Sequence, residues 1–342
     1  MLDLLTSTRA KDARACKRLH KLRYLLGYAP AAEADALRFG TAWHALQEAW
    51  WLAPAAERLA RALALLASLV VADDYERVTL EALICAYDAR WGGEEYEVLA
   101  IERQFRAPLI NPATGAASRT WQIGGKVDGL LARDGRRLLL EHKTTSEDAG
   151  PGSDYWAKLR LDGQISIYYD GAASLGFHVD DCLYDVVSKP RIRPSAVPVL
   201  DDEGQRIVLD SAGARARTKD GKKWRQTADS AAGLTVQTRQ ETAEEFRARL
   251  VADIAADPSR YLSRGAVVRL ESEIDEARAD LWALGRELAE SAAAGRFPRN
   301  PDACMRWGRK CAFWPVCTGE ASIEDPKLYR KLETVHPELE AA

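Results

Sequence analysis

Residues 122–145, QIGGKVDGLLARDGRRLLLEHKTT, decide the fold expected for this chain because they have the pattern of a β-hairpin. Two runs rich in Val, Ile and Leu flank Asp134-Gly135, a dipeptide that favours a tight two-residue turn. Such a turn fixes the register of the two strands and places Asp128 directly across from Glu141. Like charges at opposed positions are destabilising, and a cation between them would reverse that effect.

Three polar side chains share one face of this hairpin. Lys143 follows Glu141 by two residues, so the period of a strand places it on the same side as Glu141 and Asp128. Carboxylates bind hard cations such as Mg²⁺ or Mn²⁺, and a lysine can stabilise charge that develops during the reaction. Asp128, Glu141 and Lys143 are therefore catalytic candidates for metal-dependent phosphodiester hydrolysis. The alternative is a salt-bridge ladder on an exposed hairpin.

The composition limits the partners that the chain can have. The 342 residues can form one elaborated domain or two smaller ones, and we expect a single domain over residues 1–342. The formal net charge of −3 means that binding to a polyanion would need a local basic groove. The sequence lacks a long apolar run and begins with many charges, which predicts a cytoplasmic protein without a membrane segment.

The first hundred residues are expected to be mainly helical. A basic helix is predicted from about Thr8 to Tyr28 and contains Cys16, and a second helix from Leu37 to Trp51 contains His44 and Glu48 four residues apart. A histidine among tryptophans and alanines is usually a packed core residue, and metal ligation is the alternative. Residues 54–90 have the pattern of amphipathic helices.

Further strands and helices should follow on both sides of the hairpin. The run Glu97 to Phe105 alternates like a strand, and its Glu102 is interpreted as a strand-face charge in preference to a buried acid of the site. A helix predicted from Ser153 to Gly171 carries Gln164 and Tyr168 on one face. That face could reach a strand edge or a nucleotide.

From residue 190 to about 233 the periodicity fades and Pro, Gly and charged residues increase. This segment contains Arg215, Arg217, Lys219, Lys222, Lys223 and Arg225, together with Trp224. Cations beside an aromatic ring suit single-stranded nucleic acid, in which phosphates contact Lys or Arg and a base stacks on the ring. The alternative is a solvated, mobile loop.

Three cysteines lie close together near residue 310, in FPRNPDACMRWGRKCAFWPVC (residues 297–317). Cys304, Cys311 and Cys317 need a fourth ligand to hold a zinc ion or an iron–sulfur cluster, and Cys16 is the candidate. Ligation of a [4Fe–4S] cluster by four cysteines fits this arrangement, and core or free thiols are the alternative. Such a site would connect the two ends of the sequence.

Taken together, these motifs resemble the PD-(D/E)XK nuclease superfamily, and within it the RecB/AddB-like branch. GGKVDG followed by LLLEHKTT matches the core motif, and GTAWHALQE matches an earlier helix that bears a histidine. The Q-x-x-x-Y motif matches Gln164 and Tyr168. One early and three late cysteines are similar to the iron–sulfur subgroup, which includes AddB-type nucleases, the CRISPR-adaptation nuclease and phage exonuclease-like proteins. The spacing between Cys304 and Cys311 is longer than in several relatives.

The resemblance implies an α/β (α+β) fold: a restriction-endonuclease-like core with a mixed central β-sheet flanked by helices. A helical N-terminal part (1–95) would precede the core (96–190), a basic insertion (190–245) and a C-terminal iron–sulfur module (246–342). The resemblance also implies His44, Asp128 and Glu141 as metal ligands and Lys143 as the catalytic lysine. Gln164 and Tyr168 would position the DNA strand or support the site.

The implied activity is a Mg²⁺/Mn²⁺-dependent deoxyribonuclease with a structural [4Fe–4S] cluster, acting on single-stranded DNA ends in recombination, repair or phage DNA processing. No GxxxxGK[ST] motif is present, so unwinding would need a helicase partner. Two alternatives stay open. One is a DNA-binding or assembly subunit with little activity of its own, and the other is a structural zinc protein.

Overall fold

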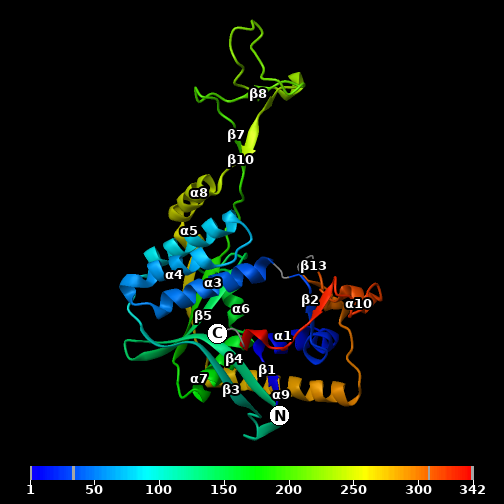
Figure 1. Cartoon of the computed structure of the whole chain (residues 1–342). Helices are drawn as coiled ribbons and strands as arrows, with labels where there is room; N and C mark the ends of the chain where they lie inside the picture. The colour runs from blue at the N-terminus through cyan, green and yellow to red at the C-terminus, as the bar shows by residue number, and fades with distance from the viewer. Residues whose placement is uncertain (1, 33–34, 307–308, 340–342) are drawn as a thin grey trace.

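The predicted hairpin forms the centre of a six-stranded mixed sheet in the computed structural model (Figure 1). The structure describes residues 2–32, 35–306 and 309–339. The six strands are β1 (Asp3–Leu5), β3 (Glu97–Ile110), β4 (Ala117–Arg133), β5 (Arg136–Thr145), β6 (Asp181–Ser188) and β11 (Leu262–Val267). β5 and β6 run parallel, and their connection carries the helices α6 (Asp154–Leu159) and α7 (Gly163–Ser174). A parallel pair requires such a crossover.

The expected hairpin register is confirmed. Asp134 and Gly135 both have positive φ values, 52° and 76°, as a primed two-residue turn requires. The β4–β5 ladder begins at Arg133–Arg136 and ends at Gly129–Leu140, one step before Asp128 and Glu141.

One edge of β4 is shared by two strands. β3 pairs along nearly the full length of β4 on the other edge. On the shared edge, β1 pairs with residues 121–123 and β5 pairs with residues 129–133. Between these pairings, residues 124–128 have no strand partner on that side within the described part of the chain. The sheet therefore forks at Asp128.

Helices cover both faces of the sheet. One core is formed with α1 (Ser7–Ala15), α7 and α9 (Glu271–Ala293). The other is formed with α3 (Asp35–Leu52), α4 (Arg58–Ser68), α5 (Asp74–Trp91) and α8 (Ala243–Ala256). Figure 1 shows α3, α4 and α5 on one side of the strands and α7 and α9 on the other. The expectation of a mixed central sheet flanked by helices is therefore confirmed.

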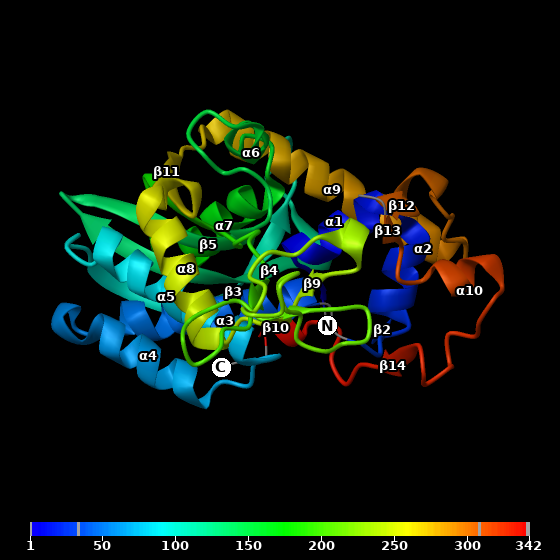
Figure 2. The same ribbon diagram turned by 90° about the horizontal axis from the view of Figure 1, so that it is seen from above.

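A small third core holds the two ends of the described chain together. Leu22 packs with Phe313 and Tyr329. The elements around it are α2 (Lys17–His20), a π-helix (Lys21–Leu25), β2 (Tyr28–Pro30), β12 (Met305–Arg306), β13 (Arg309–Lys310), α10 (Trp314–Thr318) and β14 (Tyr329–Lys331). β14 pairs with β2, and Figure 2 shows this module on the opposite side of the molecule from α4.

Two predicted helices are interrupted. The helix expected from Thr8 to Tyr28 breaks at Cys16, whose φ of −163° and ψ of 119° are extended. The side-chain amide of Asn300 donates to the carbonyl of Ala15 at the end of α1, so a distant partner ends that helix. The helix expected from Ser153 to Gly171 is two helices, because Asp162 caps a new start at α7.

The segment expected to be a loop projects from the body as a narrow arm, which we define as residues 196–240 (Figure 1). Its paired strands are β7 (Ala196–Pro198) with β10 (Thr238–Gln240), and β8 (Val208–Leu209) with β9 (Thr235–Val236). The remaining short helices are 3₁₀ turns at Ala55–Glu57, Ser230–Ala232, Pro258–Arg260, Pro301–Ala303 and Pro337–Leu339.

Candidate active site and metal centre

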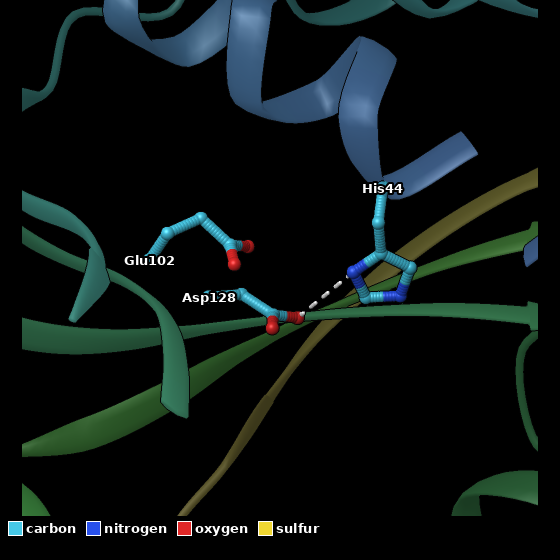
Figure 3. A group of neighbouring side chains, drawn as sticks. All are labelled: His44, Glu102 and Asp128. Carbon is cyan, nitrogen blue, oxygen red and sulfur yellow. Dashed lines mark ion pairs between the residues drawn. The ribbon is translucent and has the colours of Figure 1, made fainter. Parts of the chain in front are cut away.

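Three potential metal ligands meet where the sheet forks (Figure 3). His44 extends from α3, Asp128 from β4 and Glu102 from β3, and one ligand atom of each lies within 4.8 Å of the others. Nδ1 of His44 is 3.7 Å from Oδ2 of Asp128. The cluster therefore joins the α3 side of the molecule to two neighbouring strands.

Glu102 belongs to this cluster, although the sequence favoured a simple strand-face charge. The β3–β4 register pairs the residues on either side of Glu102 with the residues on either side of Asp128. Its φ of 52° lies in the left-handed region, which is uncommon for residues other than glycine. The carboxylate forms an ion pair with Lys126. The signal that identifies Glu102 is thus the β3–β4 register, which the sequence leaves open because the link of residues 111–116 is longer than a two-residue turn.

Glu141 lies beside the cluster and is almost completely buried, at 1% exposure. Its Oε1 accepts hydrogen bonds from Nζ of Lys143 and, at 2.8 Å, from Nε2 of Gln164. Its Oε2 is buried and has no hydrogen-bond partner within the described residues. Glu141 therefore has an unused acceptor in a dry environment, and such a group is costly unless it is paired.

Asp128 is held by the backbone of the neighbouring strand. The N–H of His142 donates to Oδ2 of Asp128 at 2.7 Å, at the point where the β4–β5 ladder stops. A continued antiparallel ladder would direct that N–H to the main chain of β4. Because β4 and β5 separate here, the carboxylate of Asp128 takes the place of a main-chain carbonyl as the acceptor of the His142 N–H. This hydrogen bond fixes the position of the carboxylate.

Gln164 and Tyr168 reach the same place from α7. Nε2 of Gln164 is 2.8 Å from the hydroxyl of Tyr168 as well as 2.8 Å from Glu141. The structure therefore brings together His44, Asp128, Glu141, Lys143, Gln164 and Tyr168, six of the residues expected from the sequence, and it adds Glu102.

The electrostatics of the site are dominated by burial. Burial raises the pKa of Glu141 to about 8, with a further contribution from Asp128 and an opposing one from Lys143. Burial opposes the charge on Lys143, yet the facing Glu141 and Asp128 hold the pKa of Lys143 above its usual value. Burial also lowers the pKa of His44 to about 4, so the imidazole is neutral near pH 7 and its nitrogen is available as a ligand.

These residues fit a divalent metal ion. A neutral imidazole and carboxylate oxygens are the donor types that Mn²⁺ and related ions accept, and Mg²⁺ favours the oxygens. The buried Oε2 of Glu141 has no hydrogen-bond partner among the described residues, so it offers an oxygen that a bound cation could pair with. The ligands would be His44, Glu102 and Asp128, with Glu141 adjoining them.

The four cysteines expected to act together line one cavity of about 260 Å³. Cys16 lies at the break after α1, and Cys304, Cys311 and Cys317 come from the C-terminal module. Burial raises the pKa of Cys311 and Cys317. Trp307 and Gly308, which belong to the same predicted module, lie outside the described residues.

The basic residues of the insertion are not brought to this site. Arg215, Arg217, Lys222, Lys223 and Trp224 lie in the arm, which projects away from the sheet (Figure 1). Any role of theirs must therefore involve a part of a ligand that is remote from the metal cluster.

Comparisons with curated proteins, solved structures and family models gave the following findings. No curated protein matches the chain. A solved structure titled "Crystal structure of SSO0001" is similar at 12% identity and a TM-score of 0.23, over 74% of this chain and 75% of that one. Among the described residues, no helix combines the length and the apolar composition that are needed to cross a membrane. The family model for the PD-(D/E)XK nuclease superfamily matches residues 5–318, so the chain belongs to this superfamily of metal-dependent nucleases.

Proposed function

We propose that this protein is a Mg²⁺- or Mn²⁺-dependent deoxyribonuclease that degrades DNA from single-stranded ends, in recombination, repair or phage DNA processing. The observation that carries the proposal is the meeting of His44, Glu102 and Asp128 beside the buried Glu141 and its ion-pair partner Lys143. The burial of Glu141 and Asp128 argues against the alternative of a salt-bridge ladder on an exposed hairpin.

The protein groups have separate tasks in this proposal. A divalent ion bound here would supply a water molecule of lowered pKa and would offset charge on the phosphorane-like transition state. His44, Glu102 and Asp128 bind the ion, and the His142 N–H orients Asp128. Lys143 is held as a cation by Glu141 and stabilises charge on the phosphate. Gln164 orients Glu141, and supporting residues of this kind affect activity about 10–100-fold.

The decisive experiment is digestion of end-labelled single- and double-stranded DNA with Mg²⁺ or Mn²⁺. We expect Asp128→Ala and Lys143→Ala to reduce cleavage at least about 100-fold, the scale on which a group that stabilises the transition state acts. Asp280→Ala and Lys327→Ala change exposed residues of the same types and should retain full activity. Full activity in both site variants would remove this site from the reaction and favour a DNA-binding or assembly subunit.

A circular single strand separates exonuclease from endonuclease action. An enzyme that needs an end leaves the circle intact while it degrades a linear strand of the same sequence. Cleavage of the circle at a comparable rate would contradict the requirement for an end and would leave the nuclease proposal in place.

We also propose that Cys16, Cys304, Cys311 and Cys317 hold a [4Fe–4S] cluster. Within the described chain, only His44, Glu102 and Asp128 form a group of three ligand atoms within 4.8 Å, so no three of the four sulfurs come that close. A single zinc ion with Zn–S bonds of about 2.3 Å needs sulfurs roughly 3.8 Å apart. The wider spacing around a cavity favours a larger group.

Iron analysis and visible absorbance test the cluster. Purified protein should be brown and should contain about four iron and four sulfide ions per chain, as the cluster type requires. Cys16→Ser should lose the colour. Colourless protein with stoichiometric zinc would contradict the cluster assignment.

A further inference from the structure

The arm is attached to the body by polar contacts of Glu241, whose side chain is buried. Glu241 is 3% exposed, and its carboxylate accepts hydrogen bonds from Arg249 at 2.8 Å and from Ser195 at 2.6 Å. The hydroxyl of Tyr75 on α5 donates to the carbonyl of Glu241 at 2.6 Å. Ser195 and Glu241 flank the arm, and we call them its root. Because both residues of the root are held by these contacts, the body orients the arm.

The tip of the arm is built around one tryptophan. The guanidinium carbons of Arg217 and Arg215 lie 4.0 Å and 4.6 Å from the centre of the Trp224 ring. Arg215 also forms an ion pair with Asp201. The ring thus packs against two guanidinium groups, and its role in this structure is to position cations.

The positive charges of the tip are not neutralised locally. Arg217, Lys219, Lys222 and Lys223 are exposed, and none forms an ion pair with a described residue. Four of the six acids of the arm have other partners, and the remaining two, Asp202 and Glu203, are exposed. Asp201 binds Arg215, Asp210 accepts backbone N–H groups of its own turn, and Asp229 caps a 3₁₀ turn. Asp220 accepts from Thr218.

Basic residues continue from the root of the arm to the edge of the active-site sheet. The N–H of Lys189 donates to the carbonyl of Thr145 at 2.7 Å, where β5 and β6 end side by side. Arg191 donates to the carbonyl of Ser146 at 2.7 Å, and Arg193 follows before the root. The β5 strand that carries Glu141 and Lys143 therefore ends beside a basic segment that leads into the arm.

We propose that the arm binds the phosphodiester backbone of the substrate strand at a distance from the bond that is cleaved. Phosphates contact the tip formed by Arg217, Lys219, Lys222 and Lys223, and the segment 189–193 contacts the nucleotides between tip and site. Affinity then depends on strand length, because a short strand that fills the site does not reach the tip. The inference rests on the proposed nuclease function, since it assigns the arm to the same substrate.

The test compares Lys222→Glu/Lys223→Glu with the charge-matched control Arg119→Glu/Arg286→Glu. The control residues are exposed and lie on β4 and α9, away from the arm (Figure 1). Dissociation constants are measured with Ca²⁺ for a single strand of about six nucleotides and for one of about forty. Cleavage of the short strand is measured with Mn²⁺, and circular dichroism checks the folding of each variant.

We expect the arm variant to bind the long strand at least about tenfold more weakly and to cleave the short strand normally. The slope of log K against log[salt] should fall by about 1.4 in magnitude, because each of the two replaced lysines accounts for about 0.7 when it neutralises a phosphate of a single strand. Equal weakening for both lengths, an equal effect of the control, or unchanged binding would overturn the proposal. Unchanged binding would indicate that the cations of the arm bind an acidic protein instead of DNA.

The two proposals fail in different ways. If the wild type cleaves no DNA but binds long strands through the arm, the nuclease proposal is contradicted and the arm proposal stands. If cleavage depends on Asp128 and Lys143 while the arm variant behaves as the wild type at both lengths, only the arm proposal is contradicted.

Discussion

Glu102 combines an unfavourable backbone conformation with a place in the metal cluster. A left-handed φ costs about 1–2 kcal/mol for a residue with a Cβ atom. Strain of this kind is concentrated at functional sites. The conformation turns the Glu102 carboxylate towards Asp128 and His44, so we infer that stability is sacrificed here for ligand placement.

Comparison of Glu102→Gly with Glu102→Ala separates the cost of the backbone conformation from the loss of the metal-binding carboxylate. Both variants lose the carboxylate, so both should need at least about tenfold more Mn²⁺ for half-maximal cleavage. Glycine tolerates a positive φ and alanine does not, so the glycine variant should be more stable by about 1 kcal/mol. Urea unfolding of the two proteins measures that difference. Equal stability would show that the backbone at Glu102 is unstrained.

The other site residues differ in how far the sequence could identify them. The turn at Asp134-Gly135 was sufficient to predict the β4–β5 register as far as Gly129 and Leu140, because a two-residue loop leaves one register. Glu102 was missed because the link between its strand and β4 contains residues 111–116, which leave the register open. Hydrophobic periodicity describes faces of elements and carries no information on a left-handed residue.

At the level of elements, α7 approaches the sheet closely because Gly171 has no side chain. A Cβ atom at Gly171 would lie 2.6 Å from the ring of Phe105, which is 3% exposed. The buried ring has no room to move, since protein interiors are closely packed. The same helix carries Gln164, so its distance from the sheet also determines the contact with Glu141.

Gly171→Ala should therefore reduce both stability and cleavage. Overpacking costs about 1–3 kcal/mol, and the better helix propensity of alanine returns roughly 1 kcal/mol of that. We expect a net loss of about 1 kcal/mol in the free energy of unfolding and a smaller kcat at unchanged KM. Gly176→Ala, beyond the end of α7, has no atom near its Cβ position and serves as a comparison for backbone strain alone. Higher stability of Gly171→Ala would show that α7 can move away.

A buried ion pair connects the helices to the far side of the sheet. Asp185 on β6 accepts from the hydroxyl of Tyr87 on α5 at 2.5 Å and lies 3.1 Å from Arg264 on β11. Burial alone would raise its pKa, but the Arg264 guanidinium holds the pKa of Asp185 well below its usual range. A carboxyl group with a depressed pKa stabilises the fold above about pH 4 and loses that contribution as the pH falls.

Asp185→Asn should lower the free energy of unfolding at pH 7 by about 1–3 kcal/mol, because the buried Arg264 loses one of its two carboxylate partners and keeps Glu94. Between pH 4 and pH 2 the wild type should lose more stability than the variant, since only the wild type has this carboxylate to protonate. Urea titrations at several pH values measure both effects. Parallel pH curves for the two proteins would contradict the assignment to Asp185.

Helix boundaries show the limit of local patterns at this scale. The sequence predicted one helix through Cys16 because its periodicity continues from Leu19 to Leu26. The observed break depends on Asn300, which caps Ala15. Such a partner is distant in sequence, so no window of neighbouring residues could indicate it.

At the level of the whole molecule, the C-terminal module is held by few apolar contacts. Its buried core consists of Leu22, Phe313 and Tyr329, whereas the cores on the sheet are much larger. The main-chain N–H of Arg18 donates to the carbonyl of Pro298 at 3.1 Å, and its side chain donates to the carbonyl of Phe297. We infer that the cluster proposed for the four cysteines would supply much of the stability of this module.

Cys16→Ser should therefore loosen this module without unfolding the sheet. In hydrogen exchange, amides in residues 297–331 should lose protection, while those of β4 and β5 should keep it. Cys85→Ser changes a cysteine outside the cavity and should leave both regions protected. Unchanged protection of residues 297–331 in Cys16→Ser would show that protein contacts alone are sufficient to stabilise the module.

The overall arrangement was predictable from the sequence because the superfamily motifs occur in order. The projecting arm was not predictable, since its two-stranded pairings are too short to show periodicity.

The separation of Cys16 from its partners also affects how the protein is made. Cys16 and Pro298, which are in contact, are 282 residues apart, and the nuclease side chains from His44 to Tyr168 lie between them. At about 5–20 residues per second, the ribosome needs roughly 7–30 s to proceed from Tyr168 to Cys317. During that interval the nascent chain already contains every carboxylate of the cleavage site but not the last cysteines. If the four cysteines hold the proposed cluster, its assembly can be completed only after the carboxylates of the site have been synthesised.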